Sequence, residues 1–522
     1  MTTKKSGDWS PEVEQIAARR KLVERMGGEA KLKRQRDAGR LNVRERIDAF
    51  ADPGTWAEVG AIAGFGEYDE NGELTDLAAP NFVVGSCRVE GRKVIIGADD
   101  FTVRGGASDA SIRGKQLHAE LMANKLGLPL VRMIEGTGGG GSIKSLETMG
   151  ATYVPANPAW DTVVDNMSVI PVIAYGGGPV AGLGAGRTAM SHLAIFVKGL
   201  AQLFVAGPPV VLHATGQDLT KEELGGYEVH RRSGAVERWV DSEEEAFAEI
   251  RRFLSYLPSN VNEIPTVIDN DDPVDRRDEA LISLIPRDRR KVYRLKPLLD
   301  GVFDSGSVFT YAEYGGSIFT GLARLDGHPV GVIATDPYKG AAMTGQGGQA
   351  MTRLVDLCTM FHLPIVSLTD QSGLAIGLAA ERTGAIRDGA RAISAAYQAN
   401  VPMAEVVVRR VFGVGGAGQV NRHGYVPQWA WPSGDWGSLP VEGGIEAAYR
   451  SELEASDDPD ALLAKIQEEM EAIRSPLRTA ERFGVDDLID PRDSRRLLCE
   501  WVRDAYRLLP PLVGRPSFGM RP

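Results

Sequence analysis

The chain has 522 residues, of which 43% are hydrophobic and 25% are charged, and its formal net charge is −11. This length exceeds what one hydrophobic core supports and predicts two large globular domains. The negative charge argues against a nucleic-acid-binding surface, which needs clustered Lys and Arg. Glycine is frequent, at 61 residues without a Gly-X-Y period, which predicts many tight turns and close backbone approaches.

The cysteines and the apolar stretches exclude further classes of protein. Cys87, Cys358 and Cys499 form no C-x-x-C motif or His/Cys cluster, so we expect neither a structural metal nor a disulfide framework. The first residues lack the apolar core of a secretion signal. The longest apolar stretch, 193–212, contains Lys198 and two adjacent prolines, which predicts a buried strand–turn–strand and not a membrane span. We therefore expect a cytoplasmic protein without membrane or nucleic-acid partners.

The first half of the chain predicts an alternation of strands and helices after a charged helical region over 12–44. Its elements are a strand, an amphipathic helix, a strand that follows Pro129, and a strand that leads into glycines: 94–98, 117–123, 130–134 and 169–174. Such alternation predicts βαβ crossovers and a largely parallel sheet. The segment 240–294, rich in Asp, Glu, Arg and Pro, predicts a helix followed by a linker.

The second half predicts the same order of elements. They are a strand, a helix and two further strands: 330–334, 354–358, 365–368 and 401–408. Charged helices over 461–474 and 494–508 close the chain, and solvated surface is the simplest reading of most of their positions.

Four segments of the first half recur in the second half in the same order. The pairs are CRVEGRKVIIGADD (87–100) with ARLDGHPVGVIATD (323–336), LGLPLVRMIEGTG (126–138) with FHLPIVSLTDQSG (361–373), GPVAGLGAG (178–186) with GVGGAGQV (413–420), and DPGTWAEV (from 52) with DSGSVFTY (from 304). The offsets are 235 or 236 residues for the first three pairs and 252 for the fourth. A common strand–glycine–helix pattern would explain one pair but not four in register. We predict a duplication, with domains over 1–275 and 285–522.

Glycine-rich loops are predicted after strands in both halves, at EGTGGGGS (135–142), YGGGPVAGLGAG (175–186) and FGVGGAGQ (412–419). They can be simple tight turns, the reading that each loop favours when taken alone. Alternatively, they expose backbone N–H groups at a helix N-terminus, as an oxyanion hole for an enolate or tetrahedral oxygen. No convincing phosphate-binding motif, G-x-S-x-G elbow or His–nucleophile pair is present. Two such loops without visible acid–base groups fit chemistry in which a cofactor supplies the base.

Longer motifs carry a family resemblance. They are NVRERIDAFADPGTWAEVG, DDFTVRGGASD and HATGQDLTKEELGGYEVHRRSGAVE in the first half, and FTGLARLDGHPVGVIATDP, TGAIRDGARAI and FGVDDLIDPRDSRRLL in the second. From about Leu41 to Leu498 the chain resembles the carboxyltransferase (β) subunits of biotin-dependent acyl-CoA carboxylases, including the propionyl-CoA and methylcrotonyl-CoA types.

The resemblance implies an α/β protein of two tandem crotonase-like ββα-superhelix domains. The domain over 1–275 would bind acyl-CoA and the domain over 285–522 carboxybiotin. CO2 would pass to the α-carbon, or the vinylogous γ-carbon, of the acyl-CoA through an enolate. The active site would lie between subunits of a homohexamer, a trimer of dimers. A separate subunit with biotin carboxylase and biotin carrier domains would deliver the carboxyl group, and no metal is expected in this subunit.

The resemblance also implies site residues. Backbone donors at Gly182 and Leu183 would hold the enolate oxygen, and donors near Val414, Gly415 and Gly416 would hold the biotin ureido oxygen. The implied acyl-CoA-binding residues are Gly105, Gly106, Ala107, Gly138, Gly139 and Gly140. The implied biotin-binding residues are Ser372, Gly373, Leu374, Gly384 and Ala385.

The chain departs from the family pattern at these ligand loops. It has EGTGGGG in place of S-G-G-A-R, A-G-L-G in place of A-G-G-A, and D-Q-S-G-L-A-I-G in place of D-V-P-G-F-x-x-G. F-G-V-G-G-A-G-Q replaces Y-G-G-A-Y-D, and QGGQAMTR lacks the usual lysine. Because the scaffold motifs are intact, we expect a retained fold and assembly with altered substrate preference. The alternatives are a biotin-independent acyl-CoA decarboxylase or hydrolase, or a non-catalytic partner in a carboxylase complex.

Overall fold

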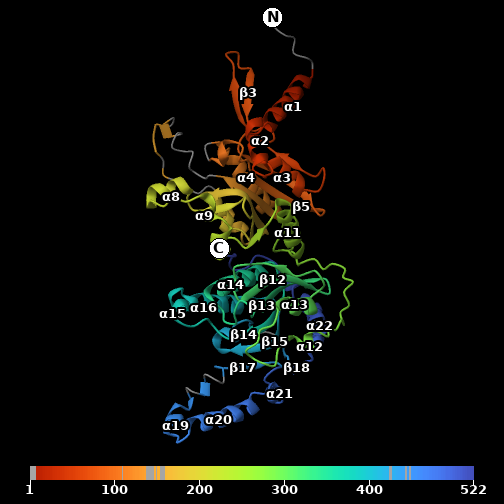
Figure 1. The fold of residues 1–522 in the computed structure, drawn as a ribbon. Coiled ribbons are helices and arrows are strands. Elements are labelled where there is room, and N and C mark those ends of the chain that lie inside the picture. Colours follow the sequence, from red (N-terminus) through yellow and green to blue (C-terminus); the bar gives the residue numbers. More distant parts are fainter. Residues whose placement is uncertain are drawn as a thin grey trace. The chain divides into compact units, whose positions relative to one another are not determined.

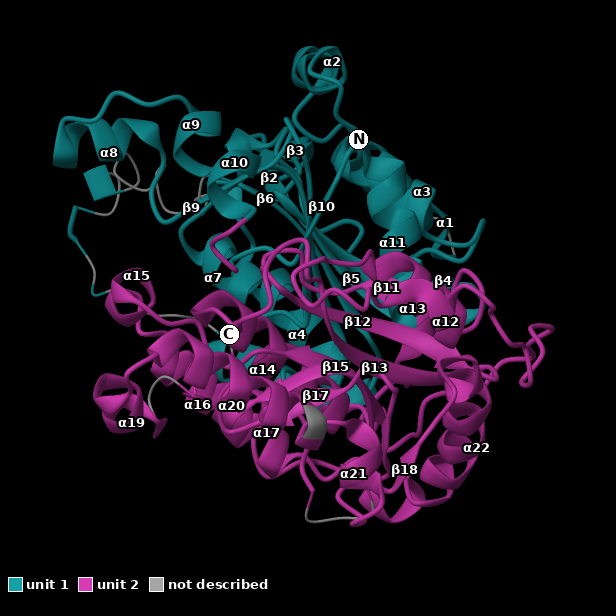
Figure 2. Ribbon diagram, turned by 60° about the horizontal axis from the view of Figure 1, so that its bottom comes forward, with its two compact units in different colours: residues 1–231, 235–254, 522 teal, residues 232–234, 255–521 magenta. Residues whose placement is uncertain are grey.

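The computed structural model describes residues 8–107, 110–136, 146–147, 150–152, 154, 159–422, 426–440, 444–445 and 448–521. The chain forms two compact units, coloured teal and magenta in Figure 2. Unit 1 holds the described residues up to 231 together with 235–254, and unit 2 holds 232–234 and 255–521. Each unit contains an eight-stranded mixed sheet with helices. The predicted α/β class is confirmed.

The sheet of unit 1 has the strand order β1-β4-β5-β6-β7-β8-β10, with β9 beside β7. Figure 1 labels β5 of this sheet and β3 of a separate hairpin. The strands are β1 (Ala57–Val59), β4 (Phe82–Val89), β5 (Arg92–Asp99), β6 (Leu130–Gly136), β7 (Val172–Ala181), β8 (Leu193–Val197), β9 (Gln202–Phe204) and β10 (Arg238–Val240). β1, β4 and β5 pair antiparallel, and the pairs from β5 to β10 are parallel. A separate hairpin consists of β2 (Phe65–Tyr68) and β3 (Leu74–Ala78).

Three helices precede this sheet, and the remaining helices of unit 1 follow its strands. They are α1 (Ser10–Glu24), α2 (Glu29–Asp37), α3 (Val43–Phe50), η1 (Arg104–Gly106), α4 (Arg113–Leu126), α6 (Trp160–Asn166), α7 (Leu183–Ala189), α8 (Pro208–Thr215), α9 (Lys221–Gly225), α10 (Tyr227–His230) and α11 (Glu243–Tyr256). The apolar stretch 193–212 forms β8, β9 and the first turns of α8, so its second apolar run is helical from Pro208. No helix in the described part of the chain has the length and apolar character of a membrane span.

The sheet of unit 2 repeats this arrangement, in the order β11-β12-β13-β14-β15-β16-β18 with β17 beside β15. Its strands are β11 (Phe309–Thr310), β12 (Ile318–Leu325), β13 (His328–Thr335), β14 (Ile365–Gln371), β15 (Met403–Phe412), β16 (Gln428–Ala430), β17 (Asp435–Gly437) and β18 (Asp487–Leu488). Its helices are α12 (Leu281–Leu284), α13 (Leu295–Val302), α14 (Gly345–Met360), α15 (Leu378–Arg382), α16 (Ala385–Gln398), α17 (Gly413–Ala417), α19 (Arg450–Ala455), α20 (Pro459–Ile473), α21 (Pro476–Ala480), η4 (Pro491–Asp493), α22 (Ser494–Arg507) and η5 (Pro510–Leu512).

The two sheets also agree in register. The β4–β5 hairpin closes with the pair Val89–Arg92, and the β12–β13 hairpin closes with Leu325–His328. Each central parallel pair contains a register shift at the same place, after Ile134 in β6 and after Thr369 in β14. Shared strand order, strand direction and irregularity confirm the predicted duplication.

The sequence match at offset 252 contains an aspartate that binds the hairpin turn of each sheet, Asp52 in unit 1 and Asp304 in unit 2. In unit 1 the Asp52 carboxylate accepts the amides of Glu90 (3.0 Å) and Gly91 (2.8 Å) in the β4–β5 turn. In unit 2 the Asp304 carboxylate accepts the amides of Asp326 (3.0 Å) and Gly327 (2.8 Å) in the β12–β13 turn. The repeated aspartate therefore fixes the hairpin of each sheet, and its role is structural.

The structure shifts the sequence match between 178–186 and 413–420 by four residues, from an offset of 235 to one of 231. The first residue of β7, Val172, pairs with the first residue of β6. In the same way, the first residue of β15, Met403, pairs with the first residue of β14. β7 and β15 are therefore equivalent residue by residue, including their last residues, Ala181 and Phe412. Gly182 and Gly413 follow these strands, and both have positive φ angles, of 62° and 60°. Gly178 lies inside β7. The glycine-rich sequences of the two halves can be aligned in several ways, and the pairing of the strands shows which alignment is correct.

Most of the predicted loop over 175–186 is strand. Residues 175–181 continue β7, Gly182 alone makes the turn, and α7 begins at Leu183. A Cβ atom at Gly176 would lie 2.6 Å from the Phe196 ring, and one at Gly178 would lie 2.1 Å from Oε1 of Glu135. These glycines make room for neighbouring side chains within the sheet and do not form a turn.

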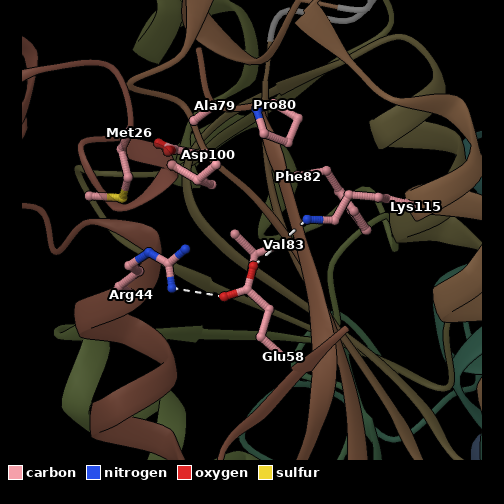
Figure 3. Close-up of a pocket in the computed structure, with 10 residues that line it drawn as sticks. Met26, Arg44, Glu58, Ala79, Pro80, Phe82, Val83, Asp100 and Lys115 are labelled. Carbon is pink, nitrogen blue, oxygen red and sulfur yellow. Dashed lines mark hydrogen bonds and ion pairs between the residues drawn. The ribbon is translucent and has the colours of Figure 1, made fainter. Parts of the chain in front are cut away.

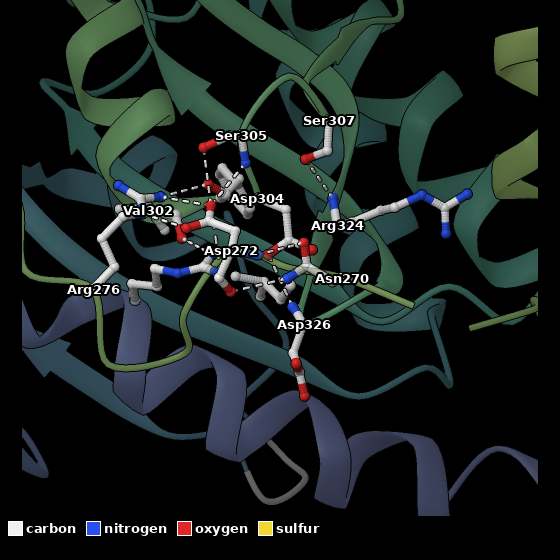
Figure 4. A network of polar contacts seen from close by, with 12 residues as sticks. Asn270, Asp272, Arg276, Val302, Asp304, Ser305, Ser307, Arg324 and Asp326 are labelled. Atoms are coloured by element: carbon white, nitrogen blue, oxygen red, sulfur yellow. Dashed lines mark hydrogen bonds and ion pairs between the residues drawn. The ribbon is translucent and has the colours of Figure 1, made fainter. Parts of the chain in front are cut away.

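A buried arginine ties the C-terminal helix α22 to the segment that enters unit 2. Arg495 has no exposed surface, and its guanidinium donates to the carbonyl oxygens of Asp272 (3.0 Å) and Pro273 (2.9 Å) and pairs with Asp304 (2.8 Å). Figure 4 shows Asp272 and Asp304 within one polar network. Arg495 ends the D-P-R-D-S-R motif, so this family motif maintains the fold of unit 2.

Candidate active site

In unit 1, the carboxyl ends of the adjacent parallel strands β5, β6 and β7 meet at one edge of the sheet, where α/β proteins place ligands. The turn over Gly105–Ala107 contacts the end of β6, because a Cβ atom at Gly106 would lie 2.7 Å from the Glu135 carbonyl oxygen. Gly105 and Gly106 both have positive φ angles. The structure thus brings Gly105, Gly106 and Ala107 to this edge, whereas Gly138, Gly139 and Gly140 lie outside the described residues.

The turn from β7 into α7 presents backbone amides at the same edge. The N–H group of Gly182 donates to the Val205 carbonyl (3.3 Å), so this amide is already engaged. Helix geometry leaves the first-turn amides that follow it, those of Leu183 and Gly184, without a partner inside α7. Leu183 is half-buried, and the available donors of this turn begin there.

Two charged residues that the sequence analysis did not single out lie at this edge. Asp99 ends β5, and its carboxylate accepts the amide of Glu135 (3.2 Å). Burial raises the pKa of Asp99 to about 7, although the Glu135 amide and Arg187 favour its charged form. Arg187 of α7 is 9% exposed and interacts electrostatically with Asp99. A charged residue directly after the apolar run VIIGA was the available signal for Asp99.

The Glu135 side chain is held by residues from the N-terminal helices. Its carboxylate pairs with Arg46 of α3 (2.5 Å) and with Arg40 (2.9 Å). Arg46 also pairs with Glu243 of α11 (2.7 Å), and Glu243 accepts the hydroxyl of Tyr175 in β7 (2.5 Å). The Arg46, Glu135 and Glu243 side chains are nearly fully buried. This Arg46 cluster fixes the end of β6, from which the first glycine loop departs.

In unit 2, the turn from β15 into α17 contacts the segment that follows β14. A Cβ atom at Gly415 would lie 2.8 Å from the Leu374 amide nitrogen and 2.9 Å from the Gly373 carbonyl carbon. Gly373 has a φ angle of 104°, and its amide donates to the Gln371 side chain (3.2 Å). Ser372 precedes Gly373 in this segment, and its backbone N–H donates to the Ala341 carbonyl oxygen (3.1 Å). The structure therefore brings Ser372, Gly373 and Leu374 against the first turn of α17.

The remaining implied biotin residues, Gly384 and Ala385, lie at the start of α16, the helix whose Gly389 contacts Leu374. The Leu374 side chain packs on Gly389 of α16, where an added Cβ atom would lie 2.6 Å from it. Gly384 precedes α16 with a positive φ angle and Ala385 begins the helix. Val414 at the start of α17 is 71% exposed, whereas Gly415 and Gly416 are buried. Val414 is thus open to a ligand or a second protein surface.

Two buried polar groups flank this turn in unit 2. Asp370, at the end of β14, forms a two-point ion pair with Arg410 of β15 (2.6 and 3.0 Å). The next residue, Gln371, is fully buried, and its Nε2 has no hydrogen-bond partner among the described residues. A buried donor without a partner is unfavourable unless a ligand or water accepts its hydrogen bond.

A small cavity in unit 1, of about 10 Å³, is lined by residues that include Arg44, Glu58, Asp100 and Lys115 and by none of the turn residues described above. Figure 3 shows Glu58 there, between Arg44 (3.0 Å) and Lys115 (3.7 Å). Burial lowers the pKa of Lys115. The cavity is just large enough for one water molecule and its cations already face a carboxylate, so it fits neither an acyl group nor biotin.

Residues 34–505 match the model of the carboxyl transferase domain family, and the chain belongs to this family. The carboxyltransferase subunit of propionyl-CoA carboxylase from Haloferax mediterranei is 33% identical to it, over 94% of this chain and 95% of that protein. Subunit alpha of methylmalonyl-CoA decarboxylase from Veillonella parvula is 29% identical, over 90% and 91%. The chain is thus a carboxyltransferase-type enzyme, as predicted.

A solved structure extends the comparison to the fold. The crystal structure of transcarboxylase 12S, described as a hexamer assembly with methylmalonyl-CoA bound, has a TM-score of 0.85 to this chain at 29% identity. The match covers 96% of this chain and 97% of that chain. The crotonase-like fold expected from the family resemblance is confirmed.

Proposed function

We propose that the chain transfers a carboxyl group from carboxybiotin to the α-carbon, or the vinylogous γ-carbon, of an acyl-CoA. The observation that carries this proposal is the equivalence of two strand-to-helix turns, one after β7 and one after β15. Each turn begins with a glycine of positive φ and presents first-turn amides at the carboxyl edge of its sheet. A two-substrate transfer needs two such donor sites, one for each oxygen that gains negative charge.

Unit 1 would bind the thioester. The amides of Leu183 and Gly184 would donate to its carbonyl oxygen, and these bonds strengthen as the oxygen becomes an enolate. The turn over Gly105–Ala107 would bind the remainder of the acyl-CoA. The half-buried Leu183 side chain narrows the space beside the donors, which favours a short acyl group.

Unit 2 would bind biotin. Backbone amides at Val414, Gly415 and Gly416 would donate to the ureido oxygen, which gains negative charge as the carboxyl group leaves, and Gln371 Nε2, without a partner among the described residues, offers a further buried donor. The exposed Val414 and Ile376 side chains provide an apolar surface for the remainder of the group. Biotin, when bound, would supply the carboxyl group and the base for the α-proton. The residues of unit 2 would orient its ureido face and restrict water.

The proposal includes partners. A biotin carboxylase and biotin carrier subunit would deliver the carboxyl group, and the chain itself would form a homohexamer, a trimer of dimers. The hexameric relative of similar fold supports the assembly. Exposed apolar side chains near the biotin turn also support it, because Ile376, Leu378 and Val414 are 90%, 67% and 71% exposed. Exposed apolar groups of this kind mark interaction surfaces.

Decarboxylation is the second candidate function, and the methylmalonyl-CoA decarboxylase relative is the observation that favours it. Loss of CO2 from a malonyl-type thioester yields the same enolate that the unit 1 amides would stabilise. The two candidate functions therefore share the enolate and differ in whether CO2 is added to it or released in forming it. Carboxylation remains the first candidate because both donor turns are present.

Co-expression of the chain with candidate biotin-bearing subunits, followed by acyl-CoA-dependent bicarbonate fixation, tests the proposal. We expect Gly415→Ala to lower turnover by about 100-fold or more, because its Cβ atom would displace the Leu374 amide. Gly114→Ala, in open space on α4, is the matched control and should leave turnover unchanged. Absence of both complex and turnover with every acyl-CoA would exclude the carboxylase. CO2 release from malonyl-type thioesters without biotin would establish a biotin-independent decarboxylase instead.

A further inference from the structure

Arg187 is a buried cation whose hydrogen-bonding capacity is not used by the described residues. The residue is 9% exposed, and its Nε and Nη2 atoms have no hydrogen-bond partner among them. A guanidinium is costly to bury without acceptors, and the free Nε–Nη2 edge has the geometry that binds a carboxylate through two parallel hydrogen bonds.

Arg187 and the first residue of the proposed donor turn lie on one face of α7. Arg187 follows Leu183 by four residues, so both lie on the same face of α7. Side chains on a helix lean toward its N-terminus. The electrostatic interaction of Arg187 with Asp99, which ends β5, also brings its guanidinium near the carboxyl edge of the sheet, where the thioester would be bound.

The neighbouring carboxylates leave Arg187 without an ion pair among the described residues. Glu120 of α4 interacts with Arg187 electrostatically, but its carboxylate oxygens form a two-point pair with Arg132 of β6 (2.8 and 2.9 Å) and also accept Asn166 (2.9 Å). Asp99 interacts with Arg187 electrostatically, but burial raises its pKa to about 7. At neutral pH Asp99 is thus only partly charged, so it does not fully neutralise the Arg187 guanidinium.

Asp99 and Arg187 have no charged counterparts at the equivalent positions of unit 2. Asp99 pairs with Phe82, the first residue of β4, and Thr335 pairs with Ile318, the first residue of β12. Thr335 of unit 2 is therefore equivalent to Asp99. Gly418 is equivalent to Arg187, counted from the ends of β15 and β7. A Cβ atom at Gly418 would lie 2.4 Å from Ile393. The shared fold thus needs neither charge, which points to a role in the chemistry of unit 1.

We propose that Arg187 is a specificity-determining residue that binds a carboxylate on the acyl group of the thioester. This inference rests on the proposed function, since it places an acyl thioester at the Leu183 turn. The carboxylate could be the one on the α-carbon, which transfer itself creates or removes. It could also be a second carboxylate at the far end of a dicarboxylic acyl group. Both sources present the same chemistry to the guanidinium.

Equilibrium binding of CoA thioesters to the full chain, measured by calorimetry, tests the proposal. Methylmalonyl-CoA and isobutyryl-CoA form one pair, because a methyl group replaces the α-carboxylate. Succinyl-CoA and butyryl-CoA form the second pair, in which the terminal carboxylate is replaced. We expect one carboxylate-bearing thioester to bind about 10- to 100-fold more tightly than its neutral counterpart, and the pair that shows this preference identifies the source.

Two variants isolate the guanidinium. Arg187→Met should remove the preference while neutral thioesters bind within about twofold of their original affinity, and Arg187→Lys should retain part of it. Arg113→Met is the control, because it removes the same charge from an exposed arginine at the start of α4. This variant should retain the carboxylate preference in full.

Each outcome decides between the proposals. Binding of neutral thioesters without any carboxylate preference in the original chain would overturn the role of Arg187 and leave the proposed function standing. Failure of all four thioesters to bind would overturn the proposed function together with the inference. Should Arg187→Met not fold, the preference of the original chain and its change in Arg187→Lys decide the question.

Discussion

The two units hold the ends of their central strands in different ways, although their sheets share one topology. In unit 1, Glu135 at the end of β6 is paired with Arg46 of α3, a residue 89 positions away in the chain. In unit 2, Asp370 at the equivalent position is paired with Arg410 of the neighbouring strand β15. The first ion pair joins the sheet to outlying helices, whereas the second stays within the sheet.

This difference shows which parts of the duplicated fold were free to diverge. The hairpin anchors Asp52 and Asp304, the register shift and the strand order are the same in both units. The polar side chains at the carboxyl edges differ. The backbone scaffold thus remained constant while the charged groups around each proposed ligand turn changed, as expected if the two turns bind different ligands.

The largest effect is expected from Arg46→Met, which would leave Glu135 and Glu243 buried without their shared cation. Breaking a buried ion pair typically costs about 3–5 kcal/mol. We expect that loss in the local stability of β6 and β7, measured by amide hydrogen exchange, with β14 and β15 unchanged. Arg36→Met, which removes an exposed pair with Glu45, is the control and should cost less than about 1 kcal/mol. Equal loss of protection in both sheets would contradict this local role.

Asp99 should make the stability of unit 1 depend on pH, whereas its equivalent Thr335 has no carboxyl to titrate. Burial raises the pKa of Asp99 to about 7, above its ordinary value of 3.8. The folded state then binds the proton more tightly than the unfolded state, so stability falls as the pH rises from about 4 to about 7. We expect Asp99→Asn to equal the original chain at pH 4 and to exceed it by at most about 4 kcal/mol at pH 8. Parallel unfolding curves for both proteins from pH 4 to 8 would refute this assignment.

Arg410→Met should have a smaller effect than Arg46→Met. The Arg410 side chain is 22% exposed, and Asp370 keeps the hydrogen bond from the Arg410 backbone amide (3.2 Å) after the substitution. We expect a loss of about 2–3 kcal/mol, confined to hydrogen exchange in β14 and β15. A loss as large as that of Arg46→Met would show that the two ion pairs are equally important.

The smallest effect is expected from Gly178→Ala in β7. The added Cβ atom would lie 2.1 Å from Oε1 of Glu135, which forces the carboxylate to move and costs about 1–2 kcal/mol. The equivalent position of unit 2 is Arg409, so only the unit with the long Glu135 side chain needs a glycine here. Gly114→Ala on α4 should be neutral or stabilising. Thermal unfolding of the two variants distinguishes these outcomes, and equal melting temperatures would contradict the steric argument.

The sequence predicted the parts of the fold that have local or repeated patterns. The apolar strands over 94–98 and 330–334 lie within β5 and β13, and the four repeated segments predicted the two sheets of one topology. The glycine turns at Gly182 and near Gly415 were identified as well. Short edge strands such as β1 and β11 were missed, because two or three residues carry no periodicity.

The polar interior could not be predicted from the sequence. Arg495 lies in a charged run whose simplest reading was a solvated surface, yet it is fully buried because its acceptors come from residues about 190 to 220 positions away. The ion pair between Arg46 and Glu135 joins residues 89 positions apart, so no local pattern indicates it. Glycines 176–178 were interpreted as a loop, because the side chains that they accommodate, Phe196 and Glu135, are distant in sequence.

The contacts of Arg495 decide where unit 2 could be excised as an independent fragment. An expressed piece that begins at residue 285 would lack the Asp272 and Pro273 carbonyl groups, leaving the cation of α22 with fewer acceptors. A piece that begins before Asp272 would retain them, at the cost of a few additional residues. The first truncation should therefore yield an aggregation-prone product, and the second is the better starting point for spectroscopy on the isolated half.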